Sequence, residues 1–189
     1  AFLWYSQDNL GLKAGVVLVL VALLFKLAAA PFHMWAPDVY EGSPTIVTAY
    51  MAIVPKIATL AILIILSLRI WLPLWNEGIQ TLLLMASVIS LMVGALGGLN
   101  QTKIKRLMAY SAIGHMGFIL LAISTSSELG LEASLFYIIL YIIMSISMFT
   151  IILGVYNGSL NYISQLSGLS RTQPLLAATL TVSLFSLAG

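Results

Sequence analysis

The stretch FKLAAAPFHMWAPDVYEGSP, residues 25–44, decides how the chain folds. It carries Lys26 in an apolar helical run, then Pro31, and then two acidic residues in a turn bounded by glycine and proline. Proline has no N–H to donate, and its ring clashes with the carbonyl four residues earlier, at Leu27. The pattern predicts a helix that breaks just after a buried lysine. Open backbone at that depth must face protein or water rather than lipid.

The composition indicates an integral membrane protein. Of the 189 residues, 61% are hydrophobic and only 7% are charged, and the mean hydropathy is +1.07. A soluble domain carries about 25% charged residues. A charge at bilayer depth costs at least about several kcal/mol. Lys26 is therefore, as a hypothesis, a functional residue. The net charge of +2 is too small and too scattered for a nucleic-acid partner.

The residues give no sign of a redox cofactor or metal on this chain. There is no cysteine, which excludes disulfides and thiolate-bound iron–sulfur clusters, and there are two histidines. No nucleotide-binding glycine loop and no nucleophilic triad pattern is present. The chain opens at Ala1 and stops inside an apolar run. We interpret it as one membrane domain (1–189) that is a fragment or one piece of a split subunit, so that a second chain completes it.

Six apolar segments are each near the length of about 20 residues that a membrane-spanning helix needs. They cover residues 15–35, 45–68, 79–99, 107–124, 133–156 and 174–189. The fold class predicted is therefore all-α, a polytopic transmembrane helix bundle with a broken helix.

Loop charges predict the orientation of this bundle. One side collects Lys103, Lys105, Arg106 and Arg171, whereas the other collects only Lys13 and Arg69. By the positive-inside rule the first side faces the cytoplasm or matrix. We interpret these cations as topology determinants or contacts to anionic lipid head groups.

The acidic turn falls on the same inner side of the membrane. Asp38 and Glu41 either cap the helix that follows or form ion pairs with a neighbour, and we expect a structural role for both. His33, between Phe32 and Trp35 near the interface, is expected to anchor the chain there.

Three titratable side chains on three predicted helices converge on one level. Lys26 and Lys56 each lie roughly 15 Å below the inner surface, and His115 reaches about the same depth. Burial penalises the charged form of an amine, so a buried lysine can take up and release a proton. We interpret the three groups as a proton relay. Snorkelling of the lysines and a structural hydrogen bond of the histidine are the alternatives.

The fifth segment carries a polar stripe at intervals of four residues. Tyr137, Tyr141 and Ser145 lie on one helix face. Packing between helices is the default explanation for such a stripe, and a secondary polar path that carries water is the alternative.

Two motifs carry a resemblance to a known family. The run FKLAAAPFHMWAPDVYEGSPTIVTAYMAIVPKIA (residues 25–58) and the run QTKIKRLMAYSAIGHMGFILL (101–121) closely resemble the antiporter-like membrane subunits of respiratory complex I. The DVYEGSP turn is similar to that of the N-type subunits, called NADH dehydrogenase subunit 2 in mitochondria. The likeness covers nearly the whole chain and implies part of an antiporter-like inverted-repeat fold.

In that family a broken helix carries a central lysine, which Lys26 before Pro31 matches. The next helix carries a second lysine, matched by Lys56. The resemblance implies a third ionisable group on a later broken helix, beyond the end of this chain. It also implies a glutamate, partner of the first lysine, on a helix before Ala1.

The resemblance implies proton translocation in the respiratory chain, driven by quinone reduction elsewhere in an NADH:ubiquinone oxidoreductase. NADH, FMN, iron–sulfur clusters and ubiquinone would be bound by other subunits. Partners implied are neighbouring antiporter-like and other complex I membrane subunits, and membrane lipids. The mitochondrial inner membrane is the expected location, with a bacterial plasma membrane or plastid thylakoid as alternatives. A cation/proton antiporter subunit and a purely structural membrane-arm subunit are the rival functions.

Overall fold

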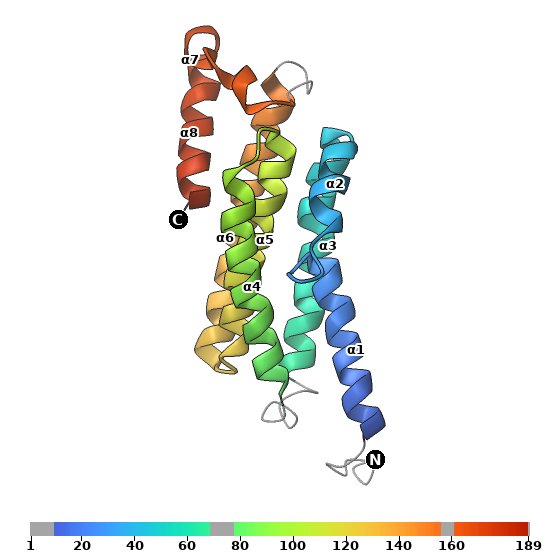
Figure 1. Ribbon diagram of the computed structural model, residues 1–189. Helices are drawn as coiled ribbons and strands as arrows, with labels where there is room; N and C mark the ends of the chain where they lie inside the picture. Colours follow the sequence, from blue (N-terminus) through green and yellow to red (C-terminus); the bar gives the residue numbers. More distant parts are fainter. Residues whose placement is uncertain (1–9, 69–77, 156–160, 189) are drawn as a thin grey trace.

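The computed structural model describes residues 10–68, 78–155 and 161–188, and these residues are almost entirely helical (Figure 1). A 3-10 helix, η5 (Ile163–Leu166), precedes the last two helices. The α-helices are α1 (Leu10–Leu27), α2 (Trp35–Gly42), α3 (Thr45–Leu66), α4 (Ile79–Leu99), α5 (Ile104–Ser124), α6 (Glu128–Gly154), α7 (Leu169–Thr172) and α8 (Pro174–Ala188). The predicted all-α bundle with a broken helix is confirmed.

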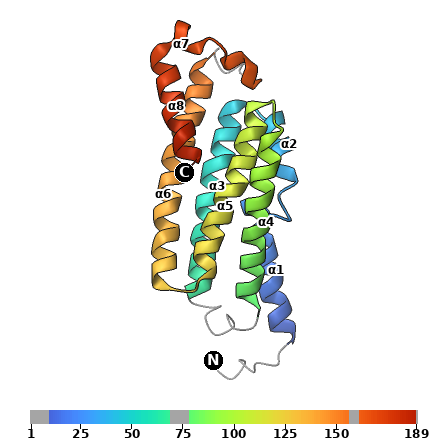
Figure 2. The same cartoon turned by 60° about the vertical axis from the view of Figure 1, so that its left-hand side comes forward.

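The long helices run side by side along one axis, and α8 lies against α6 on the side away from α1 (Figures 1 and 2). Within the described ranges, four helices are long and apolar enough to cross a membrane: α3, α4, α5 and α6. Their outer faces carry many large apolar side chains, such as Ile65, Met92 and Phe136. Lipid is the solvent that accepts such a surface.

The first predicted span, 15–35, is not one helix. Helix α1 ends at Leu27. In a continuous helix the ring of Pro31 would clash with the carbonyl group of this residue. Ala28 adopts a left-handed backbone with φ 59°, which turns the chain away from the helix axis. The broken backbone finds partners in protein: the Ala30 N–H donates to Ser90 Oγ of α4 at 2.8 Å.

The chain resumes as a short helix where the sequence predicted only a turn. Asp38 and Glu41 lie on α2, whose buried face is Ala36, Pro37 and Tyr40. These three positions share one face of a helix, and burying that face stabilises two turns that would not persist alone.

Other boundaries shift by a few residues. Helix α5 begins at Ile104 rather than 107, and α6 begins at Glu128 rather than 133. Ser127 explains the earlier start of α6, because its hydroxyl accepts a hydrogen bond from the Gly130 N–H at 3.0 Å. Arg69, Tyr156 and Gly189, which the predictions include, lie outside the described residues.

Helices α4 and α5 form the closest pair of the bundle. Ser87 Oγ donates to the Gly117 carbonyl at 2.8 Å. A Cβ atom at Gly94 would lie 2.7 Å from the Gly114 backbone, closer than real contacts allow. Small residues at a crossing permit this approach of two membrane helices.

Ion pairs join α2 to the start of α5. Glu41 pairs with Lys103 and, at 2.8 Å, with Arg106, and Asp38 lies 3.2 Å from Arg106. Lys105 Nζ donates to the Ser43 carbonyl at 2.8 Å. We call this group the α2 clamp. Asp38 and Glu41 therefore form ion pairs, which is one of the two roles expected for them, and their partners are Lys103 and Arg106.

The clamp changes the ionisation of its members. Hydrogen bonds from Lys103 and Arg106 hold the pKa of Glu41 below its usual 4.5. The same bond to Glu41 raises the pKa of Lys103 above its usual 10.5. Both shifts favour the charged forms of these two side chains, which strengthens their ion pair at neutral pH.

We expect Gly94→Ala to destabilise the bundle by about 1–3 kcal/mol, because the added methyl group meets backbone that cannot move aside. Gly114→Ala is the matched control. Its Cβ would have 3.9 Å of clearance, so this variant should be neutral or slightly stabilising. The midpoint of thermal unfolding in detergent measures both. Equal shifts for the two variants would contradict the close approach.

We expect Glu41→Gln to remove a stabilisation that depends on pH. The Glu41 pKa is depressed in the fold, so the carboxylate contributes in full above about pH 4.5 and loses its contribution as the pH falls through the depressed pKa. The advantage of the wild type over Glu41→Gln in thermal half-life should persist near neutral pH and vanish in acid. Glu132→Gln, an exposed position on α6, is the control and should leave the profile unchanged. A constant difference at all pH values would argue against the ion pair.

Candidate functional site

Lys56 is buried in the middle of the bundle. It lies on α3 and is 2% exposed. Its Nζ atom lies 3.5 Å from the Tyr141 hydroxyl of α6 and 6.0 Å from the ring centroid of Tyr40 on α2. No carboxylate in the described part of the chain lies within ion-pair distance of it. An amine without a counter-ion is unusual at such burial, because a lone buried charge is costly.

The backbone near Lys56 is opened by Pro55. This proline inside α3 cannot donate to the Met51 carbonyl. One turn on, Thr59 Oγ1 donates to the Pro55 carbonyl at 2.6 Å. Tyr141 Oη donates to the Ala52 carbonyl at 3.2 Å. The hydroxyl proton of Tyr141 is thus engaged, and its oxygen lone pair is left to accept from Lys56.

His115 packs against the ring of Tyr141. Its ring centroid on α5 is 5.5 Å from that of Tyr141, and its Nδ1 atom is 2.9 Å from the Tyr137 hydroxyl. Ser145, which is 1% exposed, is a further hydrogen-bond partner of Tyr141. All three residues of the predicted polar stripe thus belong to this cluster: Tyr141 contacts Lys56 by a hydrogen bond and His115 through its ring, Tyr137 is hydrogen-bonded to His115, and Ser145 to Tyr141.

A cavity of about 390 Å³ adjoins this cluster. It lies between α5, α6 and the end of α8, and His115, Tyr137 and Tyr141 supply polar atoms to walls that are otherwise mainly apolar. A cavity of this size has room for several waters where polar partners line it. The three polar side chains occupy one stretch of its wall.

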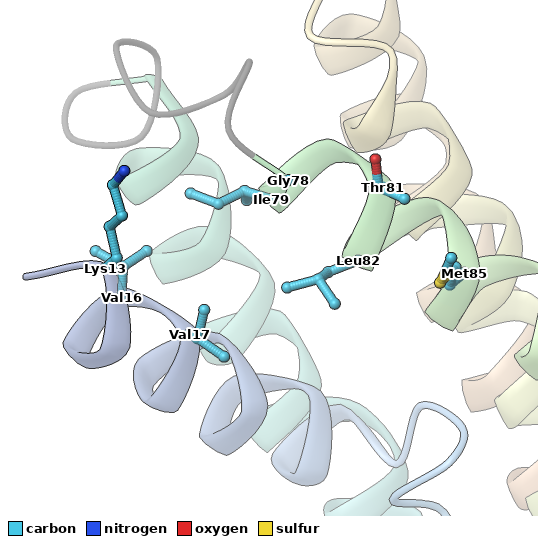
Figure 3. Close-up of a pocket in the computed structure, with 8 residues that line it drawn as sticks. All are labelled: Lys13, Val16, Val17, Gly78, Ile79, Thr81, Leu82 and Met85. Carbon is cyan, nitrogen blue, oxygen red and sulfur yellow. The ribbon is translucent and has the colours of Figure 1, made fainter. Parts of the chain in front are cut away.

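A second cavity, of about 360 Å³, lies between α1 and the start of α4 (Figure 3). Val17, Ile79 and Leu82 face into it, and Lys13 stands at one end. It contains none of the predicted site residues.

Lys26 is placed differently from Lys56. It is exposed at the end of α1, and in the described structure it contacts neither Lys56 nor His115. Pro31 is exposed beyond the break. The structure therefore unites two of the three predicted relay groups and leaves the third on an outward face.

His33 is half-buried, and its Nδ1 atom has no hydrogen-bond partner among the residues that the structure describes. Its neighbour Trp35 donates from Nε1 to the Phe25 carbonyl at 2.9 Å, across the helix break. In this region Trp35 is the side chain that links α2 to the end of α1.

Tyr40 is the site residue that the sequence reasoning missed. It is 1% exposed, beside Lys56, and its hydroxyl has no partner in the described structure. The signal was present in the spacing of residues 36, 37 and 40, which gives α2 one apolar face. Because a turn rather than a helix was predicted for these residues, the helical spacing was not recognised.

Comparison with known proteins shows that the chain is similar to membrane subunits of respiratory and antiporter complexes. Residues 3–189 match the family described as NADH:quinone oxidoreductase/Mrp antiporter, TM. NADH-ubiquinone oxidoreductase chain 2 of Metridium senile is 51% identical over 175 residues, which are 93% of this chain and 43% of that protein. NADH-quinone oxidoreductase subunit N of Pelagibacter ubique is 44% identical over 188 residues, covering 97% of this chain and 39% of that protein.

Solved structures agree with these sequence matches. A chain of respiratory complex I from Thermus thermophilus with bound Aureothin superimposes with a TM-score of 0.75 at 35% identity, covering 90% of this chain and 36% of that one. A chain of the Mrp complex from Dietzia sp. gives 0.84 at 26% identity, covering 97% and 34%.

This chain spans about two fifths of the length of the curated relatives it matches. Over that part the match is nearly continuous. The polytopic helical fold, the family match over residues 3–189 and both close relatives lead to one conclusion: the chain is an integral membrane protein that belongs to the NADH:quinone oxidoreductase/Mrp antiporter transmembrane family.

Proposed function

We propose that this chain forms part of a proton-translocating membrane subunit of NADH:ubiquinone oxidoreductase, respiratory complex I. The observation that carries the proposal is Lys56, a buried amine with no carboxylate near it among the described residues, hydrogen-bonded to Tyr141, whose ring packs against His115. In this role the chain belongs to an enzyme complex. Quinone reduction elsewhere in that complex would drive the proton movement.

The cluster has the parts that a proton relay needs. A buried ammonium is costly unless a neighbour solvates it, so Lys56 holds its proton only while the Tyr141 oxygen and nearby water accept its hydrogen bonds. When the amine releases that proton, it becomes a hydrogen-bond acceptor and the contact with Tyr141 rearranges. His115 can hold a proton on either ring nitrogen and stands beside the cavity that would supply water.

Lys26 belongs to the same proposal as the entry group of the relay. The helix break beside it, held open by Ser90, provides the irregular backbone that a membrane protein tolerates only where protein or water surrounds it. Its outward position on α1 leaves room for a carboxylate supplied by a part of the subunit outside this chain.

The remaining assignments follow from the same role. NADH, FMN, iron–sulfur clusters and ubiquinone are assigned to other subunits, and this chain carries no redox site of its own. Partners are the neighbouring antiporter-like and other membrane subunits, together with lipids. The relatives come from an animal and a bacterium, so the mitochondrial inner membrane and the bacterial plasma membrane both fit the proposal.

The Mrp complex of Dietzia sp. supports a second candidate, a cation/proton antiporter subunit, because the fold agreement is high. The two functions separate in one measurement. Proton movement that requires NADH and quinone supports the complex I role, whereas sodium-dependent proton exchange in their absence supports the antiporter.

We expect Lys56→Ala in the assembled complex to lower coupled proton transport by about a hundredfold or more, since a positioned acid–base group typically contributes at least that much. The complex should still assemble, because alanine leaves no charge to bury. Proton uptake by proteoliposomes during NADH:quinone turnover measures the effect, with Arg171→Ala on the exposed α7 as the control. Normal pumping by an assembled Lys56→Ala complex would remove the central role given to this lysine.

We expect Tyr141→Phe to weaken the same transport while leaving assembly intact. The variant deletes one oxygen atom, which breaks the contact with Lys56 and frees the Ala52 carbonyl without changing the ring. The loss should be smaller than that of Lys56→Ala, because water can replace a hydroxyl but not an amine. Tyr50→Phe, at an exposed position on α3, is the control. A transport rate equal to that of the wild type would show that the link between Lys56 and His115 is not used.

A further inference from the structure

The Tyr40 hydroxyl is a buried polar group without a partner. The side chain is 1% exposed, and the oxygen forms no hydrogen bond within the described residues. Buried hydroxyl groups in proteins are nearly always hydrogen-bonded, either to protein or to an ordered water. The position therefore calls for a bound water rather than for apolar packing alone.

The surroundings of Tyr40 supply further polar groups for such a water. Lys56 Nζ lies 6.0 Å from the Tyr40 ring centroid, and the Tyr40 and Tyr141 phenols are close enough to interact electrostatically. Tyr141 is already bound to Lys56 and to the Ala52 carbonyl. The rings of Tyr40, from α2, and Tyr141, from α6, thus both lie near the amine, at 6.0 and 5.5 Å from Nζ to the ring centroids. A polar gap too wide for a direct hydrogen bond is where a bridging water is expected.

Contacts on both sides hold Tyr40 in place. Thr48 Oγ1 donates to the Tyr40 carbonyl at 3.2 Å. The next residue, Glu41, is fixed by Lys103 and Arg106 in the α2 clamp, and Ser43 accepts from Lys105. A side chain on so constrained a helix can keep a water in one position, which is what a preorganised site requires.

We propose that Tyr40 is a positioning residue whose hydroxyl holds a water molecule against the Lys56 amine, on the side of the α2 clamp. The inference rests on the proposed function and names the route by which Lys56 exchanges protons with the clamp end of the bundle. The bridging water gives one proton to the neutral amine and takes one from the next water along the path. Tyr40 keeps its own proton throughout, so the step is balanced without ionising the phenol.

A purely structural Tyr40 makes the opposite prediction. If its ring only fills the core between α2, α3 and α5, the unpartnered hydroxyl is a cost, and Tyr40→Phe should be neutral or stabilising with transport unchanged. If the hydroxyl holds the water, Tyr40→Phe should keep assembly and the KM for quinone while lowering kcat and the number of protons moved per electron.

The test compares Tyr40→Phe with Tyr50→Phe in the assembled complex. Tyr50 is 60% exposed on α3 and should leave every readout unchanged. For Tyr40→Phe we expect coupled transport to fall by about tenfold, less than for the loss of a positioned acid or base, because Tyr40 only holds the water and transfers no proton itself. A high-resolution structure of the wild-type complex should show a water within hydrogen-bond distance of Tyr40 Oη, absent in Tyr40→Phe.

The outcomes separate this inference from the function on which it rests. Wild-type transport by Tyr40→Phe, alongside loss in Lys56→Ala, overturns the role of Tyr40 alone. A dry Tyr40 hydroxyl in the wild-type complex also overturns it, even if Tyr40→Phe fails to assemble. Normal transport in both Tyr40→Phe and Lys56→Ala overturns the relay itself.

Discussion

A helix that is interrupted within a membrane must find protein partners for the backbone groups that it opens, because lipid supplies none. In this chain the interruption after Leu27 meets that requirement through Ser90, which accepts the Ala30 N–H, and through Trp35, which donates to the Phe25 carbonyl. Both bonds tie the break to neighbouring helical structure. The rest of the site depends on this solution, since it fixes where α2 begins.

The two faces of α2 make different contacts. The outer face presents acids to Lys103 and Arg106, and these ion pairs hold the short helix against α5. The inner face carries Tyr40 to the Lys56 amine. Surface ion pairs are individually weak, so these pairs add to the burial of the apolar face of α2 rather than replace it. The same short helix thus carries both the charged contacts at the end of the bundle and a tyrosine buried beside Lys56.

The buried cluster is built from few polar atoms in apolar surroundings. Lys56, Tyr141 and His115 come from three different helices and meet across short distances, with a cavity on the side of the histidine. Within the described residues this amine has a hydroxyl partner but no carboxylate, and such a group is costly to bury. The proposed proton relay would explain why the fold keeps it, because a relay needs a group that can both hold and release a proton.

The class of fold, the place of the break and the identity of the polar groups could all be predicted from the amino-acid sequence. Hydropathy identifies membrane helices because the thickness and polarity of the bilayer limit their length and composition. Pro31 marks the break because proline has no backbone N–H to donate. Tyr137, Tyr141 and Ser145 share a face because the helical repeat is fixed. Periodicity names a face but not its neighbour. Tertiary structure alone decided that Lys56 meets Tyr141 while Lys26 turns outward, and that the acids lie on a helix paired with Arg106. Those outcomes depend on how each helix is rotated against the next, and that rotation is set by the packing of the whole bundle.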